Sequence, residues 1–134
     1  MTGVTAPRGF VAAGIKAGIK ANGNPDLALV HNLGPAYVSA AVFTSNRIQA
    51  APVQWSRAVN DGQWHAVVLN SGGANACTGQ EGYADARDMA ELTAAAVGCA
   101  PHQVGVCSTG LIGVRLPMPL LRQGIPSVAS QLSA

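Results

Sequence analysis

Residues 64–79 of the chain, WHAVVLNSGGANACTG, predict the central part of the fold. The stretch begins with Trp64–Leu69, a short and mostly apolar run that predicts a strand buried on both faces. It continues into Asn70–Gly79, whose small residues predict a loop that lets backbone segments approach each other closely. A helix is predicted soon after this loop, over Tyr83–Val97. The stretch therefore predicts a strand, a glycine-rich loop and a helix in succession.

The predicted helix has clear signals at both ends and along one face. Glu81, Asp85 and Asp88 lie near its N-terminus, where the helix dipole favours negative charge. We interpret Asp85 and Asp88 as solvated acids of the helix start rather than as a catalytic pair. Gly98 follows the last helical residue and is typical of a helix C-terminus. Small and apolar residues at helical spacing form one face, namely Ala86, Met89, Ala90, Thr93 and Val97.

A second strand followed by a glycine-containing loop is predicted after the helix. Val104–Cys107 predicts the next buried strand, and it runs directly into Ser108–Gly113, a second glycine-containing loop. Pro117 is suited to the first turn of a final helix. Three apolar residues of that helix share one face: Leu121, Ile125 and Val128.

The first part of the chain is rich in glycine and proline. Gly9–Lys20 repeats Gly-Ile-Lys at an interval that fits neither helix nor strand, so we expect an irregular segment or an edge strand. Asn22–Pro25 predicts a turn. Leu27–His31 and Tyr37–Thr44 predict two strands of a hairpin, joined by the turn Asn32–Pro35. The order of elements favours an α/β (α+β layered) fold, in which short helices cover a sheet.

Composition sets the limits on size and partners. With 134 residues, the chain is expected to form a single domain, 1–134, around one core. The net charge is +2 and the basic residues are scattered, which argues against binding to nucleic acid or to a membrane surface. Only 10% of the residues are charged and 49% are hydrophobic. Because so few charges cannot cover the surface, we expect much of the exterior to contact another polypeptide.

Cysteine and histidine do not form a recognisable site. Three cysteines without a CxxC pair and three dispersed histidines complete no usual zinc pattern, so no metal site is predicted. The odd cysteine count and the absence of a signal-peptide pattern favour a reducing, cytoplasmic environment. The longest apolar stretches are far shorter than the ~18 residues of a membrane span.

The loop after the first buried strand is the first candidate site. Its amides can simply hydrogen-bond the local backbone, as Asn and Asp do in tight connections. Alternatively, the loop lines a small-molecule cleft at the end of the strand. Phosphate binding is disfavoured, because Gln80 follows Gly79 where a phosphate loop would have lysine. The candidate cleft residues of this loop are Asn70, Ser71, Gly72, Gly73 and Asn75.

The second candidate site is Cys107–Gly110. Its spacing misses both the nucleophile elbow and the phosphate loop. Thr109 and Gly110 place a hydroxyl and a backbone N–H at the mouth of a buried strand, which is the composition of an oxyanion hole. An ordinary Ser-Thr turn is the alternative. Cys107 is more typical of an inert packing residue than of a nucleophile.

Other polar residues are weaker candidates for a catalytic or binding role. His65 opens a buried strand and is interpreted as a structural imidazole. Arg47 and Arg115 are suited to binding a carboxylate, although a lone arginine in a polar loop usually faces solvent.

Blocks of the sequence, in order along nearly the whole chain, resemble one known family. The resemblance is to the N-terminal part of the bifunctional ornithine acetyltransferase and N-acetylglutamate synthase family of arginine biosynthesis. The matching blocks are Ala40–Arg47 with Ala51–Val53, Val68–Gly79, and Cys107–Gly113 with Leu116–Pro117, preceded by Gly3–Pro7 and Gly14–Lys16.

The resemblance implies a two-chain enzyme with an N-terminal threonine nucleophile. The precursor cuts itself before that threonine into an α chain and a β chain, and these assemble as α2β2. The threonine takes the acetyl group from N-acetylornithine and passes it to glutamate. Some members also accept acetyl-CoA as a substrate, and no cofactor is implied. Thr109 and Gly110 match the pair with which the family stabilises the oxyanion.

One departure from the family pattern sets a further expectation. The family's Thr-Thr-Asp and Lys-Gly segments do not occur before Ala134, and the nucleophilic threonine belongs to the β chain. The chain is therefore expected to be a shortened α chain, without a nucleophile and inactive alone. A non-catalytic binding or assembly module and a related N-terminal-nucleophile aminopeptidase are the alternatives.

Overall fold

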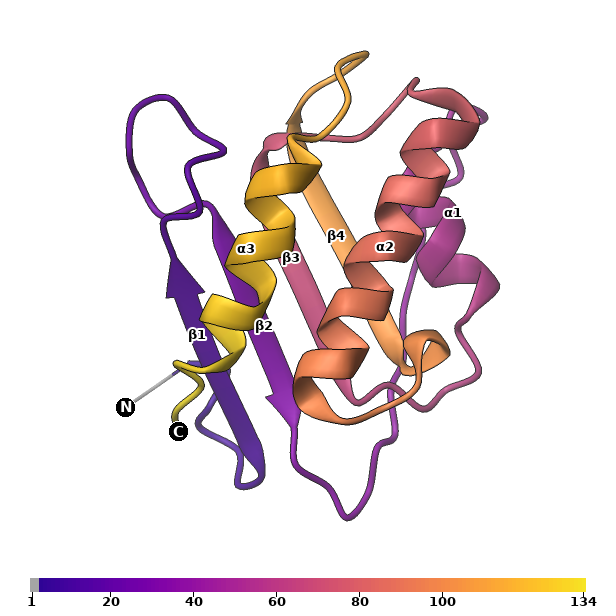
Figure 1. Cartoon of the computed structure of the whole chain (residues 1–134). Helices are drawn as coiled ribbons and strands as arrows, with labels where there is room; N and C mark the ends of the chain where they lie inside the picture. The colour runs from indigo at the N-terminus through magenta and orange to yellow at the C-terminus, as the bar shows by residue number, and fades with distance from the viewer. Residues whose placement is uncertain (1–2) are drawn as a thin grey trace.

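The computed structural model describes residues 3–134, and a mixed sheet of four strands lies at its centre (Figure 1). The strands follow across the sheet in chain order: β1 (Phe10–Ile15), β2 (Leu27–Asn32), β3 (Ala66–Gly73) and β4 (Val104–Leu111). The β1–β2 and β2–β3 pairs are antiparallel, whereas β3 and β4 are parallel. Parallel neighbours require a crossover connection, and the helix between β3 and β4 supplies it.

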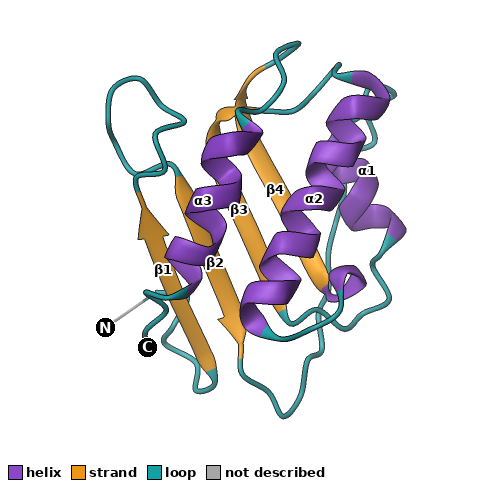
Figure 2. Ribbon diagram, viewed as in Figure 1, coloured by secondary structure: helices purple, strands orange, loops and turns teal. Residues whose placement is uncertain are grey.

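The helices cover one face of the sheet. They are α1 (Ala51–Ala58), α2 (Gly79–Val97) and α3 (Met118–Ala129), with a short 3-10 turn, η1 (Pro101–Gln103), before β4. Figure 2 shows α2 and α3 side by side on the same face, with α3 over β1 and β2 and α2 over β3 and β4. Helix α1 packs against β4 and α2. Within residues 3–134, no helix covers the opposite face, which we call the open face.

The core lies between the sheet and these helices. Leu29, Val68 and Val106 point toward the helices and are at most 2% exposed, as are Met89 of α2 and Leu121 of α3. The neighbouring residues of β3, Val67 and Leu69, are only half-buried because they point to the open face. The prediction that this strand is buried on both faces is therefore wrong for this chain.

The predicted α+β layered fold and two predicted helices are confirmed. Helix α2 starts four residues earlier than predicted and ends as expected, with Gly98 in the left-handed conformation at φ 77°. Helix α3 buries Leu121, Ile125 and Val128, and Pro117 is its N-cap. Strand β1 is an edge strand, one of the two alternatives for Gly9–Lys20.

The predicted hairpin between Leu27–His31 and Tyr37–Thr44 is wrong. Both edges of β2 are occupied by β1 and β3, so no edge remains for the second segment. Residues 37–44 form one isolated bridge, between Val38 and Gln63. Their alternating pattern identifies extended backbone, but it does not identify the partner strand.

Helix α1 was not predicted, and it closes part of the free edge of β4. The Trp55 indole N–H donates to the Val104 carbonyl at 3.1 Å. The Ser56 hydroxyl donates to the Val106 carbonyl and accepts from the Val106 N–H, both at 2.9 Å. Backbone groups of an edge strand that would otherwise be buried without partners are thus satisfied.

No helix among residues 3–134 is both long and apolar enough to span a membrane.

The role of Ser56 can be tested by removing its hydroxyl. Ser56→Ala leaves the N–H and C=O of Val106 buried without partners, which should lower the free energy of unfolding by about 2 kcal/mol or more. Denaturant unfolding of the purified protein measures this change. Ser130→Ala is the matched control, because the Ser130 hydroxyl makes an exposed hydrogen bond within its own turn. Equal stability of the two variants would contradict the role assigned to Ser56.

Candidate functional site

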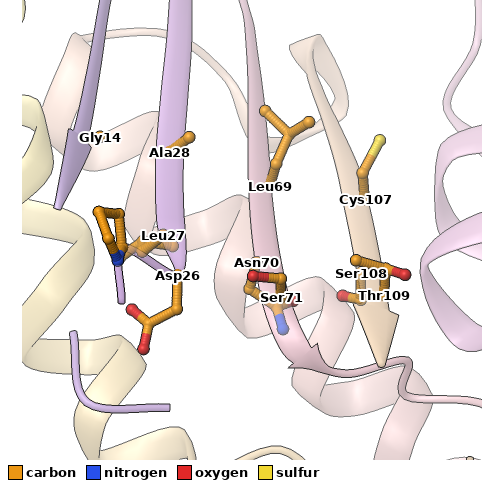
Figure 3. Close-up of a pocket in the computed structure, with 11 residues that line it drawn as sticks. Gly14, Asp26, Leu27, Ala28, Leu69, Asn70, Ser71, Cys107, Ser108 and Thr109 are labelled. Carbon is orange, nitrogen blue, oxygen red and sulfur yellow. The ribbon is translucent and has the colours of Figure 1, made fainter. Parts of the chain in front are cut away.

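A hollow of about 480 Å³ lies on the open face and contains much of the predicted site. Its floor is a row of register-paired residues that crosses the whole sheet: Gly14, Ala28, Leu69 and Cys107. Polar residues form one end of it, where Ser71 of β3 pairs with Thr109 of β4 and Asp26 lies just before β2 (Figure 3). The hollow therefore brings Asn70, Ser71 and Thr109 together at the carboxyl ends of two parallel strands.

Thr109 and Gly110 lie within β4, not in a separate loop. Both are exposed at the surface, and Thr109 lines the hollow. Gly110 has φ 132°, which strongly favours glycine, and it pairs with Gly72 of β3, which has φ 116°. A Cβ atom added at Gly110 would lie 2.5 Å from the Gly72 carbonyl carbon. Only glycine fits where these two backbones meet.

Asp26 is a polar residue of the hollow that the sequence analysis did not select. Its carboxylate accepts hydrogen bonds from the backbone N–H groups of Ala17 at 2.7 Å and Lys20 at 2.9 Å, and it is 4% exposed. Burial raises the pKa of Asp26, but hydrogen bonds from the Lys20, Ala17, Ile19 and Gly18 backbones outweigh this effect and keep the pKa below its ordinary value. No sequence pattern marks Asp26, because its donors come from residues 17–20, six to nine positions earlier, and depend on how that loop folds.

The two asparagines of the first candidate loop differ in position. Asn75 is fully buried; its amide donates to the Gly82 carbonyl at 2.8 Å, and its carbonyl oxygen accepts from the Thr78 hydroxyl at 2.7 Å. These bonds hold the start of α2, as the local interpretation expects, and Asn75 does not line the hollow. Asn70 does line it, while its amide also donates to the Gly73 carbonyl at 3.1 Å.

Two unpartnered polar atoms lie at this end of the sheet. Asn70 and Ser108 are register partners on β3 and β4. Asn70 Oδ1 and Ser108 Oγ are both buried and have no hydrogen-bond partner within residues 3–134. Buried polar atoms are normally satisfied, so these two atoms, which follow Val68 and Val106 on the helix-facing side of the strands, are exceptions at this end of the sheet.

Arg115 joins the segment after β4 to α2. Its guanidinium donates to both carboxylate oxygens of Asp85, at 2.7 and 3.0 Å, and to Glu81 at 2.9 Å. The Asp85 side chain is 5% exposed, so the expectation that Asp85 is solvated is wrong. Asp88 instead pairs with Arg122 of α3 at 2.7 Å and is 29% exposed. Arg115 is therefore occupied within the chain and holds the segment that follows Gly110.

The other predicted residues are distant from the hollow or unsuited to catalysis. His65 stacks on Tyr37 with the ring centres 3.6 Å apart, at the opposite end of β3 from Ser71, as a structural imidazole would. Cys107 is exposed on the floor of the hollow, so the expectation that it packs in the interior is wrong. Partial desolvation still raises the pKa of its thiol, which favours the protonated and poorly nucleophilic form. Arg47 is exposed and lies outside the residues that line the hollow. Within residues 3–134, no three His, Cys, Asp or Glu side chains lie together as a metal site would require.

Fold and site together define an α+β domain with a small-molecule-sized hollow at the ends of two parallel strands. The ArgJ family model matches residues 11–134, and the chain belongs to the ArgJ family.

Relatives that match the chain are longer than it. It is 60% identical over 129 residues to the arginine biosynthesis bifunctional protein ArgJ of Thermobifida fusca and 59% identical over 131 residues to that of Streptomyces coelicolor. These alignments cover 96% and 97% of this chain but 34% of each relative. The chain thus spans about a third of the length of these relatives.

Solved structures agree with the fold. The ornithine acetyltransferase of Mycobacterium tuberculosis, solved with ornithine, superposes with a TM-score of 0.96 at 54% identity, covering 98% of this chain and 71% of that one. The ArgJ protein of Bacillus halodurans superposes with a TM-score of 0.88 at 41% identity, covering 93% of this chain and 65% of that one. At these identities the likeness extends beyond the fold to the sequence itself.

Mutation can compare the stability contributed by the ion pair of the buried Asp85 with Arg115 to that contributed by the more exposed pair of Asp88 with Arg122. Asp85→Ala leaves Arg115 without its bidentate partner and should lower the melting temperature by at least about twice as much as Asp88→Ala, since exposed ion pairs contribute little. Thermal unfolding of both variants under the same conditions gives the comparison. An equal or smaller effect of Asp85→Ala would show that Arg115 does not hold this segment.

Proposed function

We propose that this chain is the α-chain portion of a glutamate N-acetyltransferase, which moves an acetyl group from N-acetylornithine to glutamate in arginine biosynthesis. Membership of the ArgJ family and 54% identity to an ornithine acetyltransferase solved with ornithine support this assignment. Synthesis of N-acetylglutamate from acetyl-CoA is a second activity that fits the bifunctional names of the relatives.

The proposed role of Thr109 and Gly110 is to stabilise the oxyanion. In a strand, successive residues direct their N–H and C=O groups to alternate sides. Because Ser56 binds both backbone groups of Val106 from outside the sheet, the N–H of Gly110, four residues on, is expected to point away from β3 as well. The Gly110 N–H is then free to donate, with the Thr109 hydroxyl beside it as a second donor.

The single observation that carries this proposal is that Thr109 lines a hollow on the open face instead of packing in the core. An oxyanion donor must reach the substrate, and an interior threonine could not. Ser71, which pairs with Thr109, adds a further polar group to the same wall.

The proposed reaction is two acyl transfers through a threonine of the β chain. The threonine hydroxyl adds to the acetyl carbonyl, and its proton passes to the threonine amine acting as base. The carbon–nitrogen bond then breaks, ornithine leaves with the proton, and an acetyl ester remains on the threonine. The neutral amine of glutamate then attacks that ester and the bond between the acetyl carbon and the threonine oxygen breaks. The proton that the amine loses passes to the threonine oxygen, which restores the free threonine. In each step the carbonyl oxygen gains negative charge, which Thr109 and Gly110 stabilise.

The proposed partner on the open face is the β chain of the same precursor, in an α2β2 cytoplasmic enzyme. Large apolar side chains near the end of β4 support this, because Leu111, Ile112 and Val114 are 67%, 68% and 58% exposed. Val42, in the extended segment 37–44, is 99% exposed. Apolar surface of this kind, on a chain with few charges, is typical of an interface. The α chain alone is expected to be inactive.

Thr109 can be tested in the complete protein with its downstream chain. Thr109→Ala removes one oxyanion donor and should lower kcat by about 10²-fold or more, with little change in folding. Thr109→Ser keeps the hydroxyl and should retain most of the activity. Steady-state kinetics of both variants, with circular dichroism as the folding control, make the comparison. Unchanged turnover of Thr109→Ala would remove Thr109 from the mechanism.

Transfer can be distinguished from hydrolysis by the acceptor. With N-acetylornithine alone, the complete enzyme should release little acetate, whereas addition of glutamate should yield N-acetylglutamate and ornithine in equal amounts. Chromatography of all products measures this directly. Acetate release that glutamate does not change would favour the hydrolytic alternative, and no turnover of either kind would favour a non-catalytic module.

A further inference from the structure

We propose that Asp26 is a positioning residue for the oxyanion site: it holds the segment 17–20 against Gly72, and Gly72 in turn fixes the backbone of Gly110. The inference rests on the proposed role of Thr109 and Gly110 and adds a residue that contacts neither of them through its side chain.

The first link is between Asp26 and the segment 17–20. One carboxylate oxygen of Asp26 accepts from the Ala17 N–H at 2.7 Å and the other from the Lys20 N–H at 2.9 Å. Its backbone joins the neighbouring strands, because its N–H donates to the Ile15 carbonyl at 3.0 Å and its carbonyl accepts from the Ser71 N–H at 2.8 Å. Asp26 thus connects this segment to β1 and to the end of β3.

The second link is between Ile19 and Gly72. A Cβ atom added at Gly72 would lie 2.8 Å from Ile19 Cγ2 and 3.4 Å from both the carbonyl carbon and the carbonyl oxygen of Ile19. The backbone of β3 therefore lies directly against Ile19 at this residue. The hydrogen bonds of Asp26 to Ala17 and Lys20 flank Ile19 and set its position.

The third link is between Gly72 and Gly110. They are register partners, and an added Cβ at Gly110 would lie 2.5 Å from the Gly72 carbonyl carbon and 2.6 Å from the Gly73 nitrogen. Ile19 therefore packs against Gly72, mainly through its side chain, and the backbone of Gly72 packs against that of Gly110. A shift of Ile19 can pass through Gly72 to the peptide bond between Thr109 and Gly110.

This geometry separates positioning from direct substrate binding. Asp26 lines the hollow, so a substrate ammonium group is the obvious alternative ligand for its carboxylate. Both of its oxygens, however, already accept strong backbone hydrogen bonds within the chain. A positioning residue affects the charge that develops in the transition state and hence kcat, whereas loss of a ground-state contact raises KM.

The test is the steady-state kinetics of Asp26→Asn in the complete enzyme. An asparagine replaces one acceptor oxygen with an NH₂ group, which cannot accept from a backbone N–H. We expect kcat to fall about tenfold or more while KM changes less than about twofold, since small displacements of catalytic groups are costly. Asp61→Asn is the matched control, because Asp61 also accepts from a backbone N–H, that of Gln63 at 2.9 Å, in an exposed turn. Asp61→Asn should leave both constants unchanged.

Ile19→Ala provides a second test of the positioning role if Asp26→Asn does not fold. It removes the side chain that contacts Gly72 and should also lower kcat with KM unchanged. Leu92→Ala is its control, because Leu92 of α2 is likewise a half-buried apolar residue at the edge of the core. Equal kcat values for Ile19→Ala and Leu92→Ala, or a rise in KM alone for Asp26→Asn, would overturn the proposal.

Thr109→Ala in the same assay distinguishes failure of the positioning role of Asp26 from failure of the proposed oxyanion site. If Thr109→Ala lowers kcat and neither Asp26→Asn nor Ile19→Ala does, only the positioning role is wrong. If none of the three variants changes kcat, the proposed oxyanion site itself is wrong.

Discussion

The parallel pairing of β3 with β4, with Gly72 opposite Gly110, is the constraint on which the site depends. At this point the two backbones approach so closely that a side chain on Gly110 would overlap Gly72. The same register sets Ser71 beside Thr109 and Asn70 beside Ser108. Polar groups of two strands thus meet at one end of a hollow whose floor is otherwise small or apolar. The position of the Thr109 hydroxyl follows from this register and not from a flexible loop.

The layering of the domain explains why the site lies on the open face. Helices α2 and α3 bury the other face of the sheet, where Leu29, Val68 and Val106 form the core with Met89 and other helix residues. Their contacts fix the strands, while Ser56 and Trp55 of α1 satisfy backbone groups of β4 before it reaches Ser108. The rest of β4 and the hollow remain accessible from the open face. Such a surface suits a chain that completes its site with a second polypeptide.

Much of the fold was predictable from the sequence because its signals are local. The spacing of Met89 and Ala90 and the terminal Gly98 predicted α2, and the apolar runs predicted the cores of β3 and β4. Strand partners were not predictable: residues 37–44 have the pattern of a strand, but β2 has no free edge for them. Thr109 and Gly110 were selected from residue type and family resemblance. The roles of Asp26 and Asp85 are not predictable from the sequence, because the partners of both carboxylates come from loops whose paths are set by the folded chain.

In the proposed mechanism, the Gly110 N–H and the Thr109 hydroxyl converge on one anionic oxygen. A crystal structure of the complete protein with a tetrahedral analogue of acetyl transfer bound at the nucleophile tests it most directly. We expect the anionic oxygen of the analogue to lie about 2.7–3.1 Å from both the Gly110 nitrogen and Thr109 Oγ1. An analogue bound at the nucleophile with its anionic oxygen in contact with neither group would show that Thr109 and Gly110 do not form the oxyanion site.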